Sequence, residues 1–349
     1  MKKRLLFVIP SLCEGGAEKS LLTLLSLMDY EKYEVDLFAF NPTGMLAEML
    51  PENVNVLNLP KDYITSRLPL IKSFFTFALR GKFKLAFYRF RYSQILRKYS
   101  YTNKAEQYAW KYLTKFLPVF DNKYSVAIGY LEKTPNYFIV DNVRAKSKIA
   151  YIHSDYEKLE VDADFDNRYF AKINWVVTVS KVCAESLIKI IPAIKSKTTV
   201  IENIILKEEI ERLSMSSPLF EGEFAGKILL TVGRISREKG IDLAVEACKT
   251  LLVDGWQVRW YHIGTGDLQE EIQSMIDANG LKNSFILLGK KKNPYKYMAQ
   301  CDIYVQPSRF EGKSIAIEET KALAKPIVAT RFSTVVNQIE DGITGFIAD

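Results

Sequence analysis

The sequence has little histidine and no paired cysteines, and both shortages exclude classes of site. Only two histidines occur in 349 residues, so a histidine-rich metal centre is excluded by arithmetic. The four cysteines, Cys13, Cys183, Cys248 and Cys301, are scattered without a C-x-x-C pair. This pattern is typical of reduced thiols in a cytosolic protein, and of neither a disulfide framework nor a zinc site. Long apolar runs are missing too, since no stretch approaches the roughly 20 residues of a membrane span.

Length and composition predict a globular protein with two domains. Of the residues, 48% are hydrophobic and 26% are charged, a balance that argues against disorder. A single core rarely extends beyond about 250–300 residues, and this chain is longer. We interpret the apolar run after Arg4 as a buried strand and not as a cleaved signal, because Pro10 interrupts it.

Charge is distributed unevenly along the chain. Residues 61–115 hold 13 Lys and Arg against two acids, a balance of +11 in a chain whose total is +7. The same segment holds 14 aromatic residues. Nucleic-acid binding is one interpretation, but no recognised nucleic-acid motif accompanies it. A basic face with interleaved rings also suits an anionic membrane surface, and the third interpretation is a helical insertion with an aromatic core. We favour membrane contact and predict no nucleic-acid partner.

Short apolar runs alternate with helical patterns almost throughout, which predicts an α/β fold with parallel sheets covered on both faces. The expected strands are 4–9, 35–40, 54–59, 126–130, 148–153, 176–180, 198–201, 228–233, 258–264, 285–289, 303–307, 327–330 and 345–348. The series pauses between Asn203 and Lys227, where a short helix precedes a Ser/Pro/Gly-containing linker. We therefore expect two doubly wound, Rossmann-like domains, 1–205 and 206–349, with a cleft between them at the carboxyl ends of the strands.

Two cations follow the expected strand 228–233, in the segment ILLTVGRISREKGIDLAVEA. A turn that leads from a strand into a helix N-terminus is an anion site, because free backbone N–H groups and the positive helix end point at the ligand. Arg234 can fork onto phosphate oxygens, and Lys239 adds a compact charge. Taken alone, the pair also fits two surface cations on a loop.

A second strand–loop–helix unit lies in VQPSRFEGKSIAIEETKALAKPIVAT. Its loop carries Glu311 and Gly312, and a helix beginning near Lys313 or Ser314 brings Glu319 round in its second turn. We expect the amides of Gly312, Lys313 and Ser314 to hold a diphosphate, and Glu319 to accept hydrogen bonds from ribose hydroxyls. A carboxylate pair near a sugar also occurs in glycosidases, but these have no need of a phosphate cradle.

Two further candidates lie in the first half of the chain. Gly15 and Gly16 open a helix after the first strand, where the backbone can approach a phosphate or a sugar, although the spacing is no dinucleotide fingerprint. His153 ends an expected strand, which is where open α/β sheets place ligand-binding groups. His262, inside a strand, is interpreted as a packing residue.

A rival pattern is the D-x-D of Asp162 and Asp164, a spacing by which some enzymes hold a divalent metal together with the diphosphate of a substrate. There the aspartates directly follow a strand, whereas here they lie in the polar segment EVDADFDNRYF. We expect a surface loop and no metal at these residues.

Taken in order, GGAEK, YIHSDY, VVTVS, VIEN, TVGRISREKG, YHIGTGDL, and PSRFEG followed by Glu319 resemble the family 4 (group 1) retaining glycosyltransferases with the GT-B fold. The resemblance implies that Glu319 binds the ribose and that Arg234 and Lys239 hold the diphosphate leaving group. It implies that Glu311 contacts hydroxyls of the donor sugar.

From the N-terminal domain, the resemblance implies that His153 and Gly16 approach the donor. Such enzymes generally need no metal and no cofactor besides the nucleotide-sugar donor. Lys313 and Ser314 stand where family members often carry an apolar residue and Pro or Gly. Ala324 replaces the usual glycine before K-P, a change we expect to be tolerated. The family normally continues with further helices beyond the point where this sequence stops, so the C-terminal end is expected to be truncated.

The expected activity is transfer of a hexosyl-type group from a nucleotide-diphosphate sugar to a glycan or lipid-linked acceptor, in the synthesis of a cell-surface polysaccharide or glycolipid. The expected location is the cytoplasm, peripherally at the inner face of the membrane. Two alternatives stay open: a sugar-nucleotide epimerase of the same fold, and a truncated, non-catalytic nucleotide-sugar-binding subunit.

Overall fold

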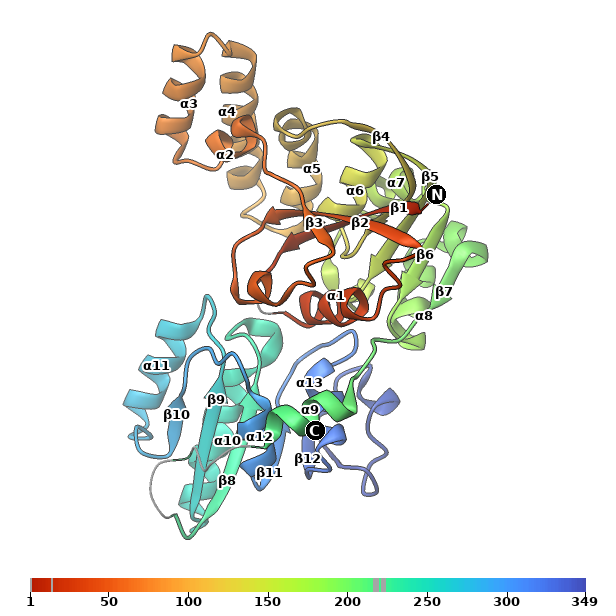
Figure 1. Ribbon diagram of the computed structural model, residues 1–349. Helices are drawn as coiled ribbons and strands as arrows, with labels where there is room; N and C mark the ends of the chain where they lie inside the picture. The colour runs from red at the N-terminus through yellow and green to blue at the C-terminus, as the bar shows by residue number, and fades with distance from the viewer. Residues whose placement is uncertain (1, 14, 216–219, 221–223) are drawn as a thin grey trace. The chain divides into compact units, whose positions relative to one another are not determined.

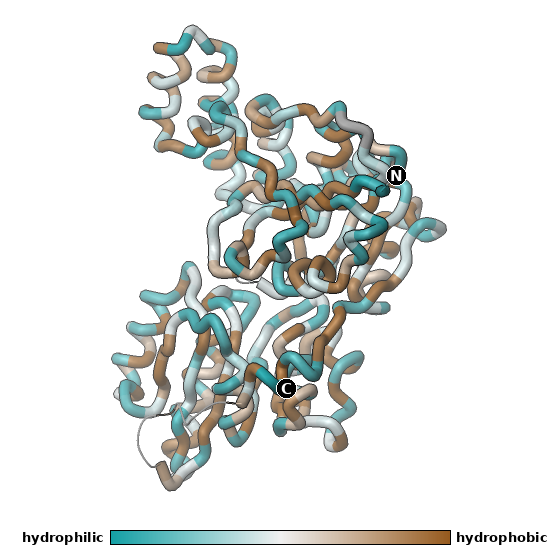
Figure 2. The backbone as a smooth tube through the Cα atoms, viewed as in Figure 1, coloured by the Kyte–Doolittle hydropathy of each residue, from teal (hydrophilic) through white to brown (hydrophobic). Residues whose placement is uncertain are grey.

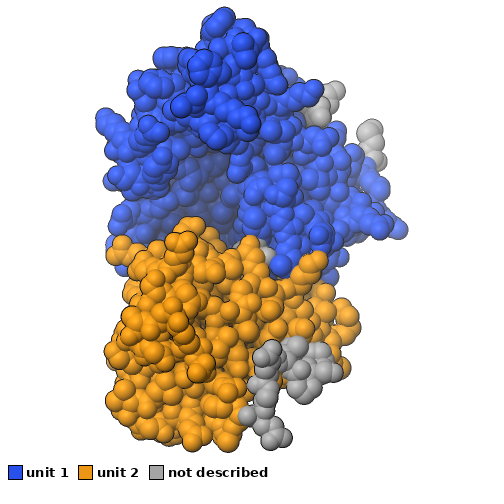
Figure 3. Space-filling view, turned by 90° about the vertical axis from the view of Figure 1, so that its left-hand side faces the viewer, with its two compact units in different colours: residues 1–202 blue, residues 203–349 orange. Residues whose placement is uncertain are grey.

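A computed structural model describes residues 2–13, 15–215, 220 and 224–349 of the chain (Figure 1). The chain divides into two compact units, unit 1 (Met1–Glu202) and unit 2 (Asn203–Asp349), coloured separately in Figure 3. The expected boundary was three residues further along. Most of the expected linker, namely 216–219 and 221–223, lies outside the described residues, as does Glu14 of the first glycine-rich loop.

Within the described residues, unit 1 contains a parallel sheet of seven strands in the order β3-β2-β1-β4-β5-β6-β7. Its strands are β1 (Lys3–Ser11), β2 (Tyr33–Asn41), β3 (Val54–Val56), β4 (Phe120–Gly129), β5 (Val143–Ile152), β6 (Trp175–Thr178) and β7 (Thr198–Val200). All seven expected strands are confirmed. Strands β4 and β5 begin earlier than expected, because the first part of β5 is the mixed sequence VRAKSK and carries no apolar run.

Helices cover both faces of this sheet. Those outside residues 61–115 are α1 (Gly16–Ser26), α6 (Thr134–Asp141), α7 (Ala163–Phe170) and α8 (Lys181–Ile190), with 3₁₀ turns η1 (Met45–Met49), η3 (Tyr156–Leu159) and η4 (Pro192–Lys197). Successive residues of β1 pack on opposite faces: Phe7 contacts the cluster that contains Leu21 of α1, and Val8 the cluster that contains Phe138 of α6. Burial on both faces explains why this strand is hydrophobic throughout.

Residues 61–115 form the helical insertion that one interpretation of the sequence proposed. The insertion consists of α2 (Lys61–Ser66), α3 (Leu70–Leu79), α4 (Phe83–Lys98), α5 (Asn103–Leu113) and the start of η2 (Thr114–Phe116). Helices α2, α3 and α4 lie beyond the sheet of unit 1, and α5 lies between them and α6 (Figure 1). Phe77 and Trp110 belong to the same core cluster as the sheet, so the insertion shares the core of unit 1.

Along the insertion, hydrophobic and hydrophilic residues follow one another closely (Figure 2). Several large apolar side chains remain exposed, among them Leu79, which is 88% exposed. Among the described helices, none is both long and apolar enough to cross a membrane.

Within its described part, unit 2 contains a parallel sheet of six strands in the order β10-β9-β8-β11-β12-β13. The strands are β8 (Lys227–Val232), β9 (Val258–Ile263), β10 (Phe285–Leu287), β11 (Ile303–Gln306), β12 (Ile327–Thr330) and β13 (Phe346–Ala348), all at expected positions. The helices are α9 (Lys207–Ser214), α10 (Ile241–Val253), α11 (Gln269–Ala278), α12 (Tyr295–Gln300) and α13 (Ile315–Ala322), with turns η5 (Arg237–Lys239) and η6 (Val335–Asn337). Two doubly covered, Rossmann-like sheets are therefore confirmed.

Candidate functional site

In unit 2, the candidate residues follow two strands that are neighbours in the sheet. Strand β8 pairs with β11 in parallel, so their carboxyl ends lie at the same edge. Arg234 and Lys239 follow β8, and Glu311 follows β11. Although 72 residues separate them in sequence, the Nζ of Lys239 lies 2.6 Å from Oε1 of Glu311. The topology thus brings together two residues that the sequence analysis singled out independently.

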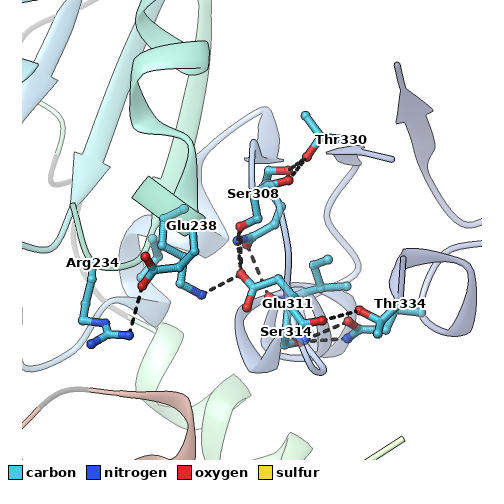
Figure 4. A network of polar contacts seen from close by, with 12 residues as sticks. Arg234, Glu238, Ser308, Glu311, Ser314, Thr330 and Thr334 are labelled. Carbon is cyan, nitrogen blue, oxygen red and sulfur yellow. Dashed lines mark hydrogen bonds and ion pairs between the residues drawn. The ribbon is translucent and has the colours of Figure 1, made fainter. Parts of the chain in front are cut away.

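The Glu311 carboxylate is held from one side (Figure 4). Besides Lys239, Ser308 donates its hydroxyl at 2.7 Å and Gln306 its amide at 3.1 Å, and all three donors contact Oε1. The hydroxyl of Thr334 donates to the backbone carbonyl of Glu311 at 3.0 Å. Among the described residues, none donates to Oε2. The arrangement fixes one oxygen and leaves the other able to accept a hydrogen bond from a ligand.

Gln306 and Ser308 were missed by the sequence analysis. Gln306 is buried at the end of β11, where the phenol of Tyr304 donates to its Oε1 at 2.7 Å and orients its amide toward Glu311. The sequence did offer a signal for Gln306, namely an amide side chain at the end of a hydrophobic strand. Such a group needs hydrogen-bond partners when it is buried, so polar side chains are expected near it.

The loop that carries Arg234 is tied to the loop after β11. The guanidinium of Arg309 contacts both carboxylate oxygens of Asp242, and the Arg309 amide donates to the Glu238 carbonyl at 2.8 Å. The hydrogen bonds from Arg309, together with its positive charge, lower the pKa of the Asp242 carboxyl. Arg234 itself contacts Glu238 at 3.2 Å with its side chain 63% exposed, so it remains accessible to a ligand.

Glycines allow the loops at this edge to approach one another closely. Gly240 has a φ of +63°, and a Cβ there would lie 2.0 Å from the carbonyl oxygen of Pro307. Gly264, after β9, has a φ of +136°, and a Cβ would lie 1.8 Å from the carbonyl oxygen of Gly233. A side chain at Gly240 would separate the loops that hold Arg234 and Glu311, and one at Gly264 would separate the loop after β9 from the turn that leads into Arg234.

Helix α13 begins where expected, with Ser314 as its N-cap. The Ser314 hydroxyl accepts from the amide of Ile317, and its own amide donates to Oε1 of Gln338 at 2.8 Å. Both groups are thus engaged inside unit 2, and a phosphate contact from Ser314 stays a prediction. Gly312 is buried and Lys313 half-buried in the preceding turn.

The neighbouring glutamates of α13 diverge, as expected for a helix. Glu318 accepts from Gln338 at 2.9 Å, whereas Glu319 is 3% exposed and its Oε1 accepts from the phenol of Tyr295 at 2.8 Å. Tyr295, at the start of α12, was not singled out from the sequence. Ala324, just after α13, has a φ of +51°, a conformation that costs a non-glycine residue about 1–2 kcal/mol.

In unit 1, Gly15 is the extended N-cap of α1, followed by Gly16 as its first residue. A Cβ at Gly15 would lie 2.1 Å from Oε2 of Glu18, because this side chain folds back toward the helix start, where Oε1 accepts from the Ser11 hydroxyl at 3.1 Å. The positive end of α1 therefore already faces a carboxylate of its own first turn.

His153 follows β5, and its ring lies beside Tyr130 and Tyr151, with ring centroids 5.2 and 5.9 Å away. Burial lowers the pKa of His153 to about 4, although the nearby Glu132 carboxylate raises it. Among the described residues, none hydrogen-bonds to its buried Nε2. His262 is fully buried in β9, and burial lowers its pKa to about 4 as well.

The D-x-D pattern has a structural role in the fold. Asp162 is the N-cap of α7, accepting from the amide of Phe165 at 2.9 Å and from the phenol of Tyr108 at 2.6 Å. It is thus at a helix start, not in the surface loop that we expected. In the described ranges, no cluster of three or more His, Cys, Asp or Glu side chains is suited to a metal ion.

The cysteines differ in accessibility. Cys183, Cys248 and Cys301 are buried, and burial raises their thiol pKa to about 12, 11 and 12 respectively. Cys13 lies half-buried in the turn before α1, where its thiol contacts the carbonyl of Thr43 at 3.6 Å.

Comparisons with known proteins show what the sequence is similar to. Residues 221–349 match the family model for glycosyl transferases group 1. Over 337 residues, covering 95% of this chain and 81% of the relative, the sequence is 26% identical to the N-acetylgalactosamine-N,N'-diacetylbacillosaminyl-diphospho-undecaprenol 4-alpha-N-acetylgalactosaminyltransferase of Campylobacter jejuni. It is 30% identical to the amylovoran biosynthesis glycosyltransferase AmsK of Erwinia amylovora, over 34% of this chain and 31% of AmsK.

Solved structures share the fold. Anabaena Alr3699/HepE in complex with UDP-glucose superimposes with a TM-score of 0.67 at 16% identity, covering 99% of this chain and 85% of that one. A glycosyltransferase from Rickettsia africae superimposes with a TM-score of 0.62 at 18% identity, covering 100% and 84%.

Proposed function

Because the chain is a group 1 glycosyltransferase with the GT-B fold, we propose that it transfers a hexosyl-type group, with retention of configuration, from a nucleotide-diphosphate sugar to a glycan or lipid-linked acceptor. The observation that carries this proposal is the Lys239–Glu311 contact at the strand edge of unit 2. The contact supports the proposal because a cation able to bind phosphate lies beside a carboxylate able to accept hydrogen bonds from a sugar. The proposed setting is synthesis of a cell-surface polysaccharide or glycolipid.

The leaving diphosphate is bound by Arg234 and Lys239. Both are cations on turns at the carboxyl edge of the sheet, and Arg234 is largely exposed. Charge that develops on the departing diphosphate is stabilised by groups already held in place, which is the largest contribution in many transfer reactions. These cations take the role that a divalent metal has elsewhere, so the proposed reaction is metal-independent and needs no cofactor.

The two carboxylates of this unit bind different hydroxyl groups. Glu311 accepts a donor-sugar hydroxyl at Oε2, because Oε1 is engaged by Lys239, Ser308 and Gln306. Glu319 accepts from the ribose, and its hydrogen bond from Tyr295 fixes its orientation. The turn of Gly312, Lys313 and Ser314 contacts the diphosphate, while Gly15, Gly16 and His153 contribute donor contacts from unit 1. We propose front-face attack with leaving-group assistance.

The helical insertion is the proposed site of contact with an anionic membrane at the inner face. Of its thirteen Lys and Arg residues, Lys82 alone pairs with an acidic residue among the described residues, at 2.6 Å from Asp62. Its exposed apolar side chains are Ile64, Ile71, Phe74, Phe75, Leu79, Phe83, Phe87, Phe90 and Tyr101. Unpaired cations attract anionic headgroups, and exposed rings and aliphatic chains bury at the acyl boundary.

Replacement of Arg234 and Lys239 by alanine tests the central assignment. We expect turnover of the preferred nucleotide sugar to fall by at least about 10³-fold, since single donors of this kind contribute about 10²–10³ each. The donor is chosen from UDP-, GDP- and ADP-sugars by thermal shift. Lys227→Ala, at the opposite end of β8, is the matched control. Near-normal turnover of the double variant, or no stabilisation of the wild type by any nucleotide, contradicts the proposal.

Membrane contact is tested by co-sedimentation with phosphatidylcholine vesicles, with and without phosphatidylglycerol. We expect the protein to bind only the anionic vesicles and to dissociate from them at high salt. The double variant Leu79→Ser/Phe83→Ser is expected to bind these vesicles more weakly. Trp256→Ser, which removes an exposed ring from unit 2, is the control. Equal binding to both vesicle types contradicts the electrostatic part of the proposal.

A further inference from the structure

Glu132 occupies the equivalent edge of the sheet of unit 1. It lies three residues after the end of β4 and is 6% exposed. Its Oε2 accepts from the amide of His153 at 3.0 Å, and its Oε1 accepts from the hydroxyl of Ser154. Across the described part of the chain, these are its hydrogen bonds, and no cation pairs with it. Neither the motifs nor the family resemblance singled out this residue.

Two other buried carboxylates of unit 1 receive more hydrogen bonds, which replace the water that a carboxylate loses on burial. Asp36, fully buried, receives the guanidinium of Arg4 at 2.8 Å, the phenol of Tyr124 and the amide of Asn55, both at 2.6 Å. Asp166, 2% exposed, takes three side-chain donors, which come from Gln107 and two tyrosines. A carboxylate offers about four acceptor positions, so Glu132, with two donors and no counter-charge, has the least compensation of the three.

The turn after Glu132 is strained. Lys133 has a φ of +66° and a ψ of −117°, outside the regions that non-glycine residues ordinarily adopt. Its Nζ lies 2.6 Å from Oε2 of Glu106 and 2.8 Å from Oδ1 of Asn103, both on α5. The hydroxyl of Thr134 also donates to Glu106. Strain of this kind persists where surrounding contacts enforce it, and it clusters at functional sites.

The chemistry of this site selects its ligand. A buried carboxylate without a cation repels a diphosphate but accepts hydrogen bonds from neutral hydroxyl groups, which restore what it lost on leaving water. His153, whose buried Nε2 has no hydrogen-bond partner among the described residues, lies directly beside it and is kept neutral by burial. The site therefore fits a neutral, hydroxyl-rich molecule such as a sugar ring.

We propose that Glu132 binds a hydroxyl of the acceptor sugar, and that the strained Lys133, held by Glu106 and Asn103, positions it. This inference rests on the proposed glycosyl transfer, since it assigns the acceptor of that reaction. Glu132 is the acceptor-binding residue, and Lys133, Glu106 and Asn103 are positioning residues.

The experiment measures sugar binding apart from turnover. Methyl glycosides of glucose, galactose, N-acetylglucosamine and N-acetylgalactosamine are titrated by saturation-transfer NMR. UDP and UDP-sugars, or the GDP or ADP equivalents where the thermal-shift test selects these, are titrated separately. We expect Glu132→Gln to weaken the best glycoside at least tenfold and to leave the affinities for UDP and UDP-sugar unchanged. Glu132→Asp, which keeps the charge on a shorter side chain, is expected to weaken the glycoside less. Glu157→Gln, on η3 and paired with Lys189, is the matched control.

The outcomes show whether the hydroxyl group that Glu132 binds belongs to the acceptor sugar or to the donor sugar. Unchanged glycoside binding by both Glu132 variants overturns the proposal, as does wild-type protein that binds UDP but none of the glycosides. Weakened UDP-sugar binding with unchanged UDP binding places the hydroxyl on the donor sugar and also overturns it. Failure of the proposed function is distinguishable, because then the wild type binds no nucleotide or nucleotide sugar at all.

Discussion

Units 1 and 2 each place a buried or half-buried carboxylate just beyond a central strand, yet they compensate its charge differently. In unit 2, Glu311 contacts Lys239 at 2.6 Å and has Arg234 in the neighbouring loop. In unit 1, the donors to Glu132 among the described residues are neutral, namely an amide and a hydroxyl. One parallel-sheet topology thus supports two electrostatic environments. The first suits a ligand that brings its own negative charge, and the second suits a neutral one.

Among changes to a single residue, the largest expected effect comes from removing the charge of Glu311, the carboxylate of unit 2. We expect Glu311→Gln to lower turnover by about 10²-fold, because the donor-sugar contact that we propose for Glu311 weakens. Binding of the nucleoside diphosphate selected by thermal shift is expected to stay as tight or become tighter, because Lys239 is released from its pair and a nearby negative charge is removed. Steady-state kinetics and titration of that nucleotide measure both. Weaker nucleotide binding would show that the pair, and not Lys239 alone, binds the diphosphate; Glu318→Gln is the control.

A smaller effect is expected at the second carboxylate of unit 2. Tyr295→Phe removes the phenol that donates to Glu319 while keeping the ring in its core cluster. A hydrogen bond to a charged group contributes about 1.5–3 kcal/mol, so we expect KM for the donor to rise roughly tenfold with kcat little changed. A fall in kcat at constant KM would assign Tyr295 to the transition state instead of ribose binding.

Lys133 and Ala324 both have a positive φ, and comparing their glycine variants tests whether the strained backbone at Lys133 contributes to ligand binding. Lys133→Gly and Ala324→Gly both relieve a left-handed backbone conformation. We expect Ala324→Gly to stabilise the protein by about 1 kcal/mol without altering any ligand affinity. Lys133→Gly is expected to weaken glycoside binding severalfold, because Glu132 is then no longer positioned. Thermal unfolding and glycoside titration check the pair, and an unchanged glycoside affinity would remove the positioning role from Lys133.

The smallest effect concerns the ion pair that joins two loops of unit 2. The pKa of Asp242 is depressed by Arg309, so the pair stabilises the fold above the ordinary carboxyl pKa of 3.8, and the stabilisation is lost as the pH falls through the lower, folded value. We expect Arg309→Met to lower the melting temperature by about 1–3 °C at pH 7. The difference should shrink progressively below pH 4. A difference that is independent of pH would indicate lost packing instead.

Much of the fold was accessible from sequence because hydrophobic runs of parallel strands are distinctive. All thirteen strands of the described residues were expected, and the early starts of β4 and β5 were missed where charge interrupts the apolar run, as in VRAKSK of β5. The order of strands was not accessible, and it is this order that brings Lys239 to Glu311. Tyr295 and Glu132 escaped notice because their residue types are ordinary, and only burial and hydrogen-bond geometry distinguish them.

Asp162 illustrates the opposite error. Two aspartates in a polar segment were read as a surface loop, yet the first of them caps α7 and receives the phenol of Tyr108 from α5. Capping depends on the three residues that follow, and the sequence DADF offered that signal.

The uneven burial of the cysteines makes the protein suitable for site-specific labelling without mutagenesis. At neutral pH the three buried thiols are protonated and shielded, so a maleimide dye should attach to Cys13 alone. That position adjoins the turn leading into Gly15 and Gly16. Because we propose that Gly15 and Gly16 contact the donor, a fluorophore there is expected to report donor binding in real time, in the unmodified sequence and at protein concentrations too low for calorimetry.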